Sequence, residues 1–333
     1  MTRAPDLETA RKLAEATGFA LRTPPGWAGL LHRPGLAAQV IPQAAELAAP
    51  AVGLTDPIGD GAFAPVPGLT HRYADRVILH LTRVCDLHCR FCFRRAVVGE
   101  SGPLPEADLT RALDYIAARP HIREVILTGG DPLTLSPRRI AAVLDRLGTL
   151  DLDLIRIHSR VPVVAPDRIA DELLSALAAV PALWFVLHTN HPDELTPEAC
   201  AAIARLTAAG IPMLSQSVLL KGVNADPDTL ETLFRRLLRL KVKPYYLHHC
   251  DLVQGAEHFR TSIPEGQAIM AILRQRLTGI GLPTYVLDLP GGHGKVPIGP
   301  GHLEAAGPGQ WRLRDREGHW HEYADPTPVP AAD

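Results

Sequence analysis

The chain has 333 residues, of which 46% are hydrophobic and 21% carry a charge. These proportions are typical of a soluble globular protein with a sizeable core, built as one large domain or as two. The formal net charge of −2 excludes a general electrostatic attraction to nucleic acid or to an anionic membrane surface.

Cysteine use and apolar patterning restrict the compartment. Only two of the five cysteines lie outside one close group, so no disulfide framework is expected and a reducing compartment fits. The N-terminal stretch is rich in charged residues, which does not suit a signal peptide. The sequence has no uninterrupted run of about 20 apolar residues that could span a bilayer. We therefore expect a cytoplasmic protein without membrane or nucleic-acid partners.

The first 70 residues predict an N-terminal helical extension. Residues 6–17 predict a helix, because Leu7, Ala10, Leu13 and Ala14 share one face at helical spacing. Residues 18–70 are rich in proline, glycine and alanine, which favours short helices and loops wrapped around a larger unit.

From Arg76 onward, strand-like and helix-like patterns alternate. The predicted strands cover 77–81, 124–127, 154–158, 184–188, 213–219, 244–248 and 284–287. The predicted helices cover 106–118, 137–147, 167–178, 197–208, 227–240 and 265–279. This alternation indicates βαβ units with parallel pairing and right-handed crossovers. We expect an α/β fold with a partial (β/α)6-type barrel over residues 71–290, although the pattern leaves a flat doubly wound sheet open. A short β-like tail is expected within residues 291–333.

Unusual polar residues follow nearly every predicted strand. In barrels of this kind the chemistry gathers at the carboxyl ends of the strands, so these residues are expected to share one rim. In chain order they are Cys85, Cys89 and Cys92; Gly129, Gly130 and Asp131; His158, Ser159 and Arg160; His188; Gln216; Asp251; and Asp288 with Lys295.

The three clustered cysteines predict an iron–sulfur site. They have the spacing C-x3-C-x2-C, and cysteine thiolates bind soft metals and iron–sulfur clusters. A cubane cluster held by three cysteines leaves one iron open to another ligand. A structural zinc site needs four protein ligands, and His88 is awkwardly placed to be the fourth because it lies inside the tight loop. The spacing resembles that of the radical S-adenosylmethionine (SAM) enzymes, in which SAM chelates the fourth iron.

Lys295 is the candidate cofactor lysine. The chain has only five lysines, and Lys295 follows a glycine-rich stretch that we expect to form a flexible loop. Such a loop can bring an amine to the aldehyde of pyridoxal phosphate (PLP). A phosphate-binding P-loop is excluded because Val296 stands where that motif needs serine or threonine. Lys221, at the end of another predicted strand, is a rival anchor.

Charged residues at the same rim predict a substrate with two charged ends. Asp251 and Asp288 end successive strands, and two enclosed carboxylates repel each other unless a cation lies between them. Arg94 follows the third cysteine and can hold a carboxylate in a bidentate fork. Together they describe a basic amino acid. The alternative is that both aspartates cap turns or pair with nearby arginines.

These motifs together resemble the lysine 2,3-aminomutase family over most of the chain. The stretches His71-Arg72-Tyr73, Tyr245-Tyr246 and Pro290-Gly-Gly-His-Gly-Lys295-Val-Pro297 belong to the resemblance. It implies that the three cysteines hold a 4Fe–4S cluster, that Lys295 holds PLP, and that the substrate is bound by Arg94, Asp251 and Asp288. It also implies contacts to the PLP phosphate from Arg72 and Arg76, and contacts to SAM from Gly129, Gly130, Asp131, His188 and Gln216. On its own, the Gly129–Asp131 stretch would be read as a glycine turn with an aspartate cap.

The resemblance implies an isomerase that interconverts L-lysine and β-lysine by 2,3-amino migration. The reduced cluster would cleave SAM to a 5′-deoxyadenosyl radical, with a flavodoxin- or ferredoxin-type protein as the electron donor. Arginine and ornithine remain alternative substrates, whereas two carboxylates would repel the side chain of glutamate. A non-catalytic iron–sulfur or zinc protein that retains the fold is the rival from another class.

The chain departs from the larger family members in one region. Those members resemble this chain through the stretch after Trp311 and continue into cysteines that bind zinc between subunits, whereas Asp226 stands where a further zinc cysteine would fall. A homo-oligomer is therefore possible without being required. In its short length and in the sequence around Cys89 and Cys92, the chain also resembles aminomutases that supply (R)-β-lysine for modification of elongation factor P. The sequence does not decide between these roles.

Overall fold

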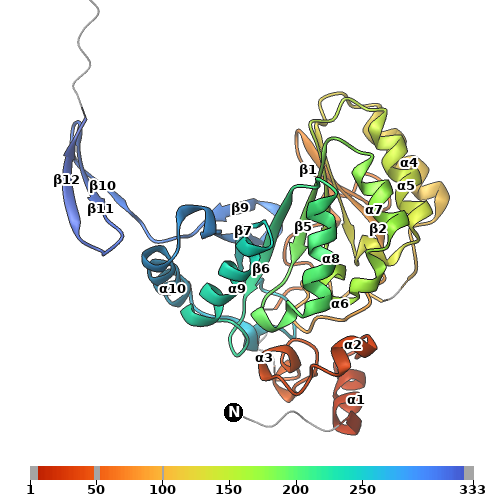
Figure 1. Ribbon diagram of the computed structural model, residues 1–333, viewed down its shortest axis with the longest axis horizontal. Coiled ribbons are helices and arrows are strands. Elements are labelled where there is room, and N and C mark those ends of the chain that lie inside the picture. The colour runs from red at the N-terminus through yellow and green to blue at the C-terminus, as the bar shows by residue number, and fades with distance from the viewer. Residues whose placement is uncertain (1–6, 49–52, 100, 326–333) are drawn as a thin grey trace, which may run out of the picture.

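The computed structural model describes residues 7–48, 53–99 and 101–325. Among these residues, nine strands form one main sheet in the order β1 to β9 (Figure 1). Neighbours from β2 to β8 pair in parallel, whereas β1 and β9 are antiparallel edges. The strands are β1 Leu69–Tyr73, β2 Arg76–Thr82, β3 Glu124–Gly129, β4 Leu154–Ser159, β5 Leu183–His188, β6 Met213–Leu219, β7 Val242–His249, β8 Thr284–Leu289 and β9 Gly294–Pro297.

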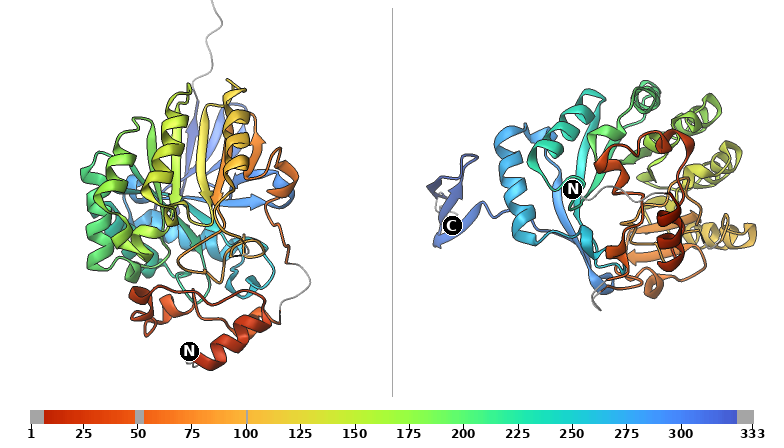
Figure 2. Two further views of the ribbon diagram at one scale, coloured as in Figure 1. Left: turned by 90° about the vertical axis from the view of Figure 1, so that its right-hand side faces the viewer. Right: turned by 90° about the horizontal axis from the view of Figure 1, so that it is seen from below.

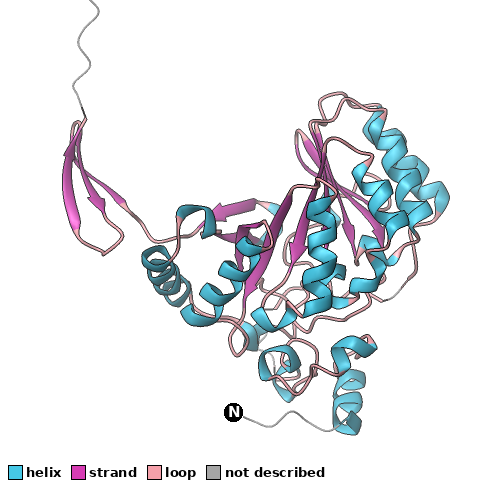
Figure 3. Ribbon diagram, in the orientation of Figure 1, coloured by secondary structure: helices cyan, strands magenta, loops and turns pink. Residues whose placement is uncertain are grey.

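Helices between the parallel strands cover the outer face of the curled sheet (Figures 2 and 3). They are α4 Glu106–Ala117, α5 Pro137–Gly148, α6 Val161–Val164, α7 Asp171–Ala178, α8 Pro197–Ala208, α9 Pro227–Arg239 and α10 Ile263–Arg276. In α9, for example, Leu230, Leu233, Phe234 and Leu237 are buried at helical spacing. Asp226 caps this helix by accepting the backbone N–H of Thr229 at 2.8 Å. The predicted α/β partial barrel is confirmed. The predicted helix at 167–178 begins only at residue 171, because residues 166–168 form a separate 3₁₀ turn.

The two edges of the main sheet approach each other across the opening of the barrel (Figure 2). The backbone N–H of Lys295 in β9 donates to the hydroxyl of Tyr73 in β1 at 3.3 Å. The glycine-rich stretch before Lys295 forms the turn between β8 and β9, whereas Lys295 itself lies in β9, whose pairing with β8 aligns it with Asp288. Residue 70 lies inside β1, and β9 lies beyond residue 290, so both expected domain boundaries fall within the main sheet.

The N-terminal segment lies beneath the barrel, at the edge where the parallel strands end (Figure 1). Its helices are α1 Leu7–Ala16, α2 Pro25–Ala28 and α3 Pro34–Ala37; the expected first residue of α1, residue 6, lies outside the described residues. Trp27 anchors the segment by donating its indole N–H to the carbonyl of Val163 at 2.6 Å. Glu46 is fully buried and forms ion pairs with Arg90 at 2.5 Å and Arg95 at 2.7 Å. The segment is therefore fastened to the loop that carries the cysteines.

A small antiparallel sheet follows the barrel and extends away from it (Figures 1 and 3). It consists of β10 Leu303–Gly307, β11 Gln310–Arg314 and β12 Trp320–Ala324. Most of its side chains are exposed, as the expected β-like tail implies. Within the described part of the chain, none of the helices combines the length and the apolar character needed to cross a membrane.

The buried ion pair predicts the effect of substituting Glu46. In Glu46→Ala, the guanidinium of Arg90, which is fully buried, loses its carboxylate. We expect the free energy of unfolding to fall by about 3–5 kcal/mol, measured by urea denaturation of the purified protein. Glu8→Ala is the matched control, because the Glu8 side chain is 78% exposed in its pair with Lys12; it should change stability by less than about 1 kcal/mol. Equal effects of the two substitutions would contradict the prediction.

Candidate functional site

The start of the cysteine loop packs directly against Gly129, the last residue of β3, and Gly130, which follows it. The backbone N–H of Gly130 donates to the carbonyl of Thr82 at 2.6 Å, and that of Asp131 donates to Val84 at 2.9 Å. A Cβ atom added to Gly129 would lie 2.3 Å from the carbonyl oxygen of Thr82, and one added to Gly130 would lie 2.3 Å from that of Val84. The glycines are therefore required by this close backbone approach.

The N-terminal segment holds the cysteine loop from the other side. The backbone N–H of His88 donates to the carbonyl of Arg22 at 3.0 Å, and the Nδ1 atom of His88 lies 2.9 Å from the carbonyl oxygen of Ala20. The ring of His88 stacks on Phe19, with centroids 5.0 Å apart. His88 thus has a structural role in the loop.

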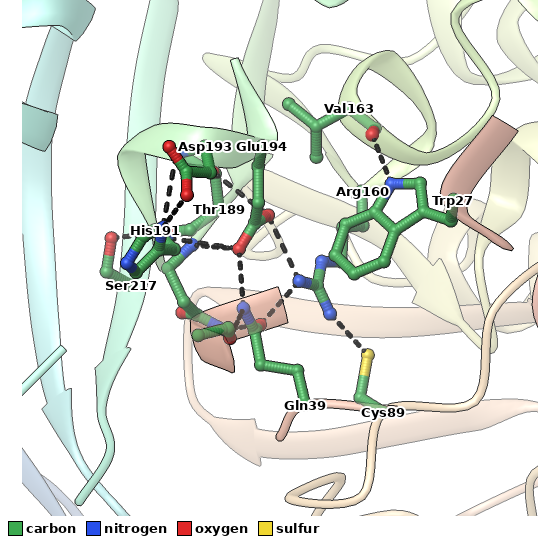
Figure 4. A network of polar contacts seen from close by, with 12 residues as sticks. Trp27, Gln39, Cys89, Arg160, Val163, Thr189, His191, Asp193, Glu194 and Ser217 are labelled. Atoms are coloured by element: carbon green, nitrogen blue, oxygen red, sulfur yellow. Dashed lines mark hydrogen bonds and ion pairs between the residues drawn. The ribbon is translucent and has the colours of Figure 1, made fainter. Parts of the chain in front are cut away.

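The chemistry of the three thiols fits a metal cluster. Burial is the main cause that raises the pKa of Cys85, Cys89 and Cys92 above the ordinary value, so a metal must displace the thiol protons when it binds. Cys89 accepts a hydrogen bond from the guanidinium of Arg160, with Nη1 2.8 Å from Sγ (Figure 4). Among the described residues, no three cysteine, histidine or acidic side chains converge as the ligands of a single ion do. A cubane cluster needs its cysteines to surround a larger space.

Asp131 links the ends of β3 and β4. Its carboxylate accepts the hydroxyl of Ser159 at 2.8 Å and the backbone N–H groups of Arg160 at 2.7 Å and Leu133 at 3.1 Å. Burial raises the pKa of Asp131 to about 6, against the opposing effect of these hydrogen bonds. The capping role is therefore present, and the contact of Asp131 with SAM stays a prediction.

His188 and Gln216 lie side by side in the register of β5 and β6. The Nε2 atom of His188 is 3.3 Å from Nδ1 of His158 in β4. Burial, helped by the charges of His248, Arg160 and Arg94, lowers the pKa of His188 to about 3. The ring is therefore neutral at physiological pH and can accept or donate a hydrogen bond without adding charge to the site.

Arg94 is paired with a carboxylate of its own chain. Its Nε and Nη2 atoms lie 2.9 and 2.8 Å from Oδ2 of Asp60, and Nη2 of Arg72 lies 3.2 Å from Oδ1 of the same residue. Burial opposes ionisation of Asp60, but the charges of Arg94, His80 and Arg72 and the hydrogen bond from Arg94 together outweigh it and keep the pKa of Asp60 below the ordinary value. Asp60 therefore occupies the guanidinium fork of Arg94 in this state of the protein, and the binding of a substrate carboxylate by Arg94 stays a prediction.

Asp288 holds the amine of Lys295. The Nζ atom lies 2.9 Å from Oδ1 of Asp288, and Nδ1 of His248 lies 3.3 Å from Oδ2. Although burial opposes it, this pair of contacts keeps the pKa of Asp288 below the ordinary value. Asp288 is therefore ionised, and in this state its partner is the predicted cofactor lysine.

Asp251 is the unsatisfied charge of the site. Its Oδ1 atom is buried and has no hydrogen-bond partner among the residues that the structure describes. Burial, followed by the nearby charge of Asp288, raises the pKa of Asp251 to about 7, while Lys295, Arg260 and Arg94 act in the opposite direction. The two aspartates are thus neighbours, as their positions at successive strand ends predict. A buried carboxylate without a partner is costly unless a cation joins it.

The predicted phosphate contacts lie at the edge next to Lys295. Arg72 belongs to β1 and Arg76 to β2, and the Arg76 guanidinium lies 4.4 Å from the ring centroid of Tyr73. The Nε atom of Arg72 is buried, and no partner for it occurs in the described part of the chain. An unpartnered buried donor suits a phosphate oxygen, so Arg72 fits the phosphate group of PLP.

Comparisons with known proteins show the family of the chain. The family model described as the Radical SAM superfamily matches residues 79–234, and the model described as Lysine-2,3-aminomutase matches residues 270–332. The L-lysine 2,3-aminomutase of Fusobacterium nucleatum is 40% identical over 290 residues, which cover 86% of this chain and 68% of that protein. The chain belongs to the lysine 2,3-aminomutase family.

Other matches show both the breadth of the family and the fold. The L-lysine 2,3-aminomutase of Clostridium subterminale is 41% identical over 86% of this chain and 70% of its own length. The glutamate 2,3-aminomutase of Clostridioides difficile is 37% identical over 79% of this chain and 63% of its own length. SuiB of Streptococcus suis, solved with the precursor peptide SuiA, has a TM-score of 0.50 and 16% identity, and covers 65% of this chain and 49% of SuiB; this similarity concerns the fold alone.

Membership of the lysine 2,3-aminomutase family makes the chain a radical SAM isomerase that uses a 4Fe–4S cluster and SAM. The structure adds Asp60 and His248 to the site, and it gives Arg160, which the sequence placed at the rim without a role, a hydrogen bond to Cys89. Arg160 and His248 follow or end predicted strands, so their position was a usable signal. Asp60 lies in a stretch without periodic pattern, and only its contact with Arg94 reveals it.

The glycine contact predicts the fate of the cluster in Gly130→Ala. Because the new methyl group would overlap the carbonyl of Val84, the cysteine loop must shift. We expect iron content after anaerobic reconstitution to fall at least about fivefold from the roughly four irons of a cubane cluster. Gly148→Ala is the control, since a Cβ there meets nothing within 4 Å. Full iron loading in Gly130→Ala would show that the loop tolerates the displacement.

Proposed function

We propose that the chain is a PLP-dependent aminomutase that interconverts L-lysine and β-lysine. The observation that carries this proposal is the pair of neighbouring carboxylates, Asp251 and Asp288, of which Asp251 has an unpartnered buried oxygen. This pair supports a substrate with a cationic side chain, because an ammonium group placed there would satisfy both charges. A substrate with a side-chain carboxylate would be repelled.

Arg94 binds the other end of the substrate in this proposal. Its guanidinium is only 14% exposed and already holds a carboxylate, that of Asp60. The substrate carboxylate therefore replaces Asp60 in the fork or shares it. Asp60 keeps Arg94 and Arg72 oriented until the substrate arrives, and so limits the reorganisation that binding requires.

Lys295 anchors PLP and thereby releases Asp288 for the substrate. In the free protein the ammonium of Lys295 neutralises Asp288 at 2.9 Å. When the amine is engaged by the cofactor, Asp288 loses this partner and becomes available to the cation of the substrate. Arg72 and Arg76 hold the phosphate. PLP supplies the means by which an amino group can migrate between neighbouring carbon atoms.

The cysteine loop and the strand ends bind the remaining cofactors. Cys85, Cys89 and Cys92 hold the cluster. SAM is bound at the ends of β3 and β5 and within β6, through Gly129, Gly130, Asp131, His188 and Gln216. The cluster and SAM together supply the radical that removes a hydrogen atom from the substrate and returns it. A small electron-transfer protein of the flavodoxin or ferredoxin type donates the electron. The residues of the chain orient the substrate and exclude water.

The direct test is an anaerobic assay of reconstituted protein. Incubation with SAM, PLP, dithionite and L-lysine is expected to yield β-lysine, detected by chromatography of the amino acids. Parallel reactions with L-arginine, L-ornithine and L-glutamate measure the preference for the side chain. Turnover of glutamate at a rate equal to or above that of lysine would contradict the assignment of Asp251 and Asp288 to a cationic substrate.

Borohydride trapping tests the cofactor lysine. Reduction of the PLP-loaded protein fixes the cofactor covalently to the amine that holds it. We expect Lys295→Ala to lose covalent PLP and Lys221→Ala to retain it, as measured by mass spectrometry of the intact chain. Retention in Lys295→Ala together with loss in Lys221→Ala would move the anchor to Lys221.

The raised pKa of Asp251 predicts how lysine binding depends on pH. Below about pH 7 the carboxyl group is mostly neutral, and only the ionised form attracts the ammonium group. Affinity for L-lysine should therefore increase about tenfold between pH 6 and pH 8, measured by equilibrium dialysis of the protein without PLP and SAM, in which the ammonium of Lys295 still acts on Asp251. In Asp251→Asn this increase should disappear. The same pH dependence in both proteins would remove Asp251 from the substrate site.

A further inference from the structure

Arg160 connects a predicted cluster ligand to the N-terminal segment. It directly follows β4 and is only 8% exposed. Its Nη1 atom donates to Sγ of Cys89 at 2.8 Å, and its guanidinium lies 4.9 Å from the ring centroid of Trp27 (Figure 4). A buried cation thus hydrogen-bonds the sulfur of one cysteine of the loop.

Two fully buried side chains hold the other end of this guanidinium. The Nη2 atom of Arg160 donates to Oε1 of Gln39 at 2.6 Å and lies 3.0 Å from Oε2 of Glu194. Gln39 and Glu194 are also joined to each other, because Nε2 of Gln39 donates to Oε1 of Glu194 at 3.0 Å. Both side chains are 0% exposed. The three groups form a closed triangle that allows the guanidinium one orientation (Figure 4).

Glu194 is itself anchored by the loop after β5. Its Oε1 atom accepts the backbone N–H groups of Asn190 and His191, both at 3.0 Å, and its Oε2 atom accepts the hydroxyl of Thr189 at 3.1 Å. Because four donors besides Arg160 satisfy this carboxylate, its position does not depend on Arg160. Glu194 is a fixed support against which the arginine is oriented.

We propose that Arg160 is a positioning residue that raises the reduction potential of the iron–sulfur cluster, and that Gln39 of the N-terminal segment holds it in place. Reduction adds negative charge to the cluster and its sulfur ligands. A hydrogen bond from a cationic donor to a ligand sulfur stabilises that charge, and hydrogen bonds to sulfur are among the factors that set cluster potentials. The inference rests on the proposed assignment of Cys89 to the cluster and is independent of the substrate.

The arrangement favours a directed hydrogen bond over a general effect of charge. Glu194 lies against Arg160 and offsets much of its positive charge at a distance. The remaining effect on the cluster comes from the N–H group of Arg160 that donates to Cys89. The strength of this hydrogen bond depends on the orientation of the guanidinium. Gln39 is neutral, so it contributes to that orientation without changing the net charge.

The primary experiment is a redox titration of the cluster in Arg160→Gln. The reconstituted holoprotein is titrated anaerobically with dithionite, without SAM or substrate, and the reduced cluster is followed by electron paramagnetic resonance. We expect the midpoint potential to become more negative. At the wild-type midpoint, the ratio of reduced to oxidised cluster should fall about tenfold, the size expected for loss of a charge-assisted hydrogen bond. An unchanged midpoint potential would overturn the proposal. This holds even if Arg160→Gln weakens the binding of SAM.

Gln39→Met provides a second, independent measurement. This substitution leaves Arg160 and its charge in place but removes one acceptor of the triangle. We expect a shift in the same direction and of smaller size, and no further shift when Gln39→Met is added to Arg160→Gln, because Gln39 acts through Arg160. If Arg160→Gln takes up no cluster, Gln39→Met decides alone: a more negative midpoint supports the proposal, and an unchanged one overturns it.

Arg168→Gln is the matched control for charge. Arg168 is 41% exposed and pairs with Asp86, the neighbour of Cys85, so its loss removes one positive charge beside the same loop. The midpoint potential of the cluster in Arg168→Gln should equal that of the wild type. A shift equal to that in Arg160→Gln would assign the effect to net charge and overturn the proposal. Iron content of Cys89→Ala tests the underlying assignment separately, because full loading there would show that Cys89 is not a cluster ligand.

Discussion

Parallel pairing of neighbouring strands is the constraint on which the rest of the structure depends. It places the carboxyl ends of β2 to β8 at one rim, and with them the residues that carry the proposed chemistry. The cysteine loop leaves this rim after β2 and is held against β3 by a backbone contact that only glycine permits at residues 129 and 130. A change in that register would move the thiols relative to every other group in the site.

The charges of the site are arranged as pairs, with one exception. Arg94 is neutralised by Asp60, and Lys295 is neutralised by Asp288. Asp251 remains without a hydrogen-bond partner for one buried oxygen among the described residues. Such an arrangement keeps buried charge tolerable in the free protein while leaving each pair open to exchange with a substrate or cofactor. The proposed binding of a basic amino acid amounts to exchanging internal partners for external ones.

The N-terminal segment is part of the site as well as a covering of the barrel. It supplies Glu46 to the two arginines of the cysteine loop, and Gln39 and Trp27 to Arg160. These contacts are buried, and therefore lie in an environment where hydrogen bonds and charges have large effects. The segment thus links the geometry of the cysteine loop to the stability of the whole fold.

The sequence by itself determined the class of fold and the main chemical groups. The alternation of strand-like and helix-like hydrophobic patterns predicts the βαβ units, and the spacing of Cys85, Cys89 and Cys92 predicts the cluster. Both signals are properties of short stretches of the sequence. Only the tertiary structure decided which side chains meet. It paired Arg94 with Asp60, 34 residues away, and Gln39 with Glu194, 155 residues away. It also placed Lys295 in strand β9, opposite Asp288, because the chain pairs with β8 directly after the glycine turn. Such contacts depend on how distant segments pack, which no local pattern in the sequence records.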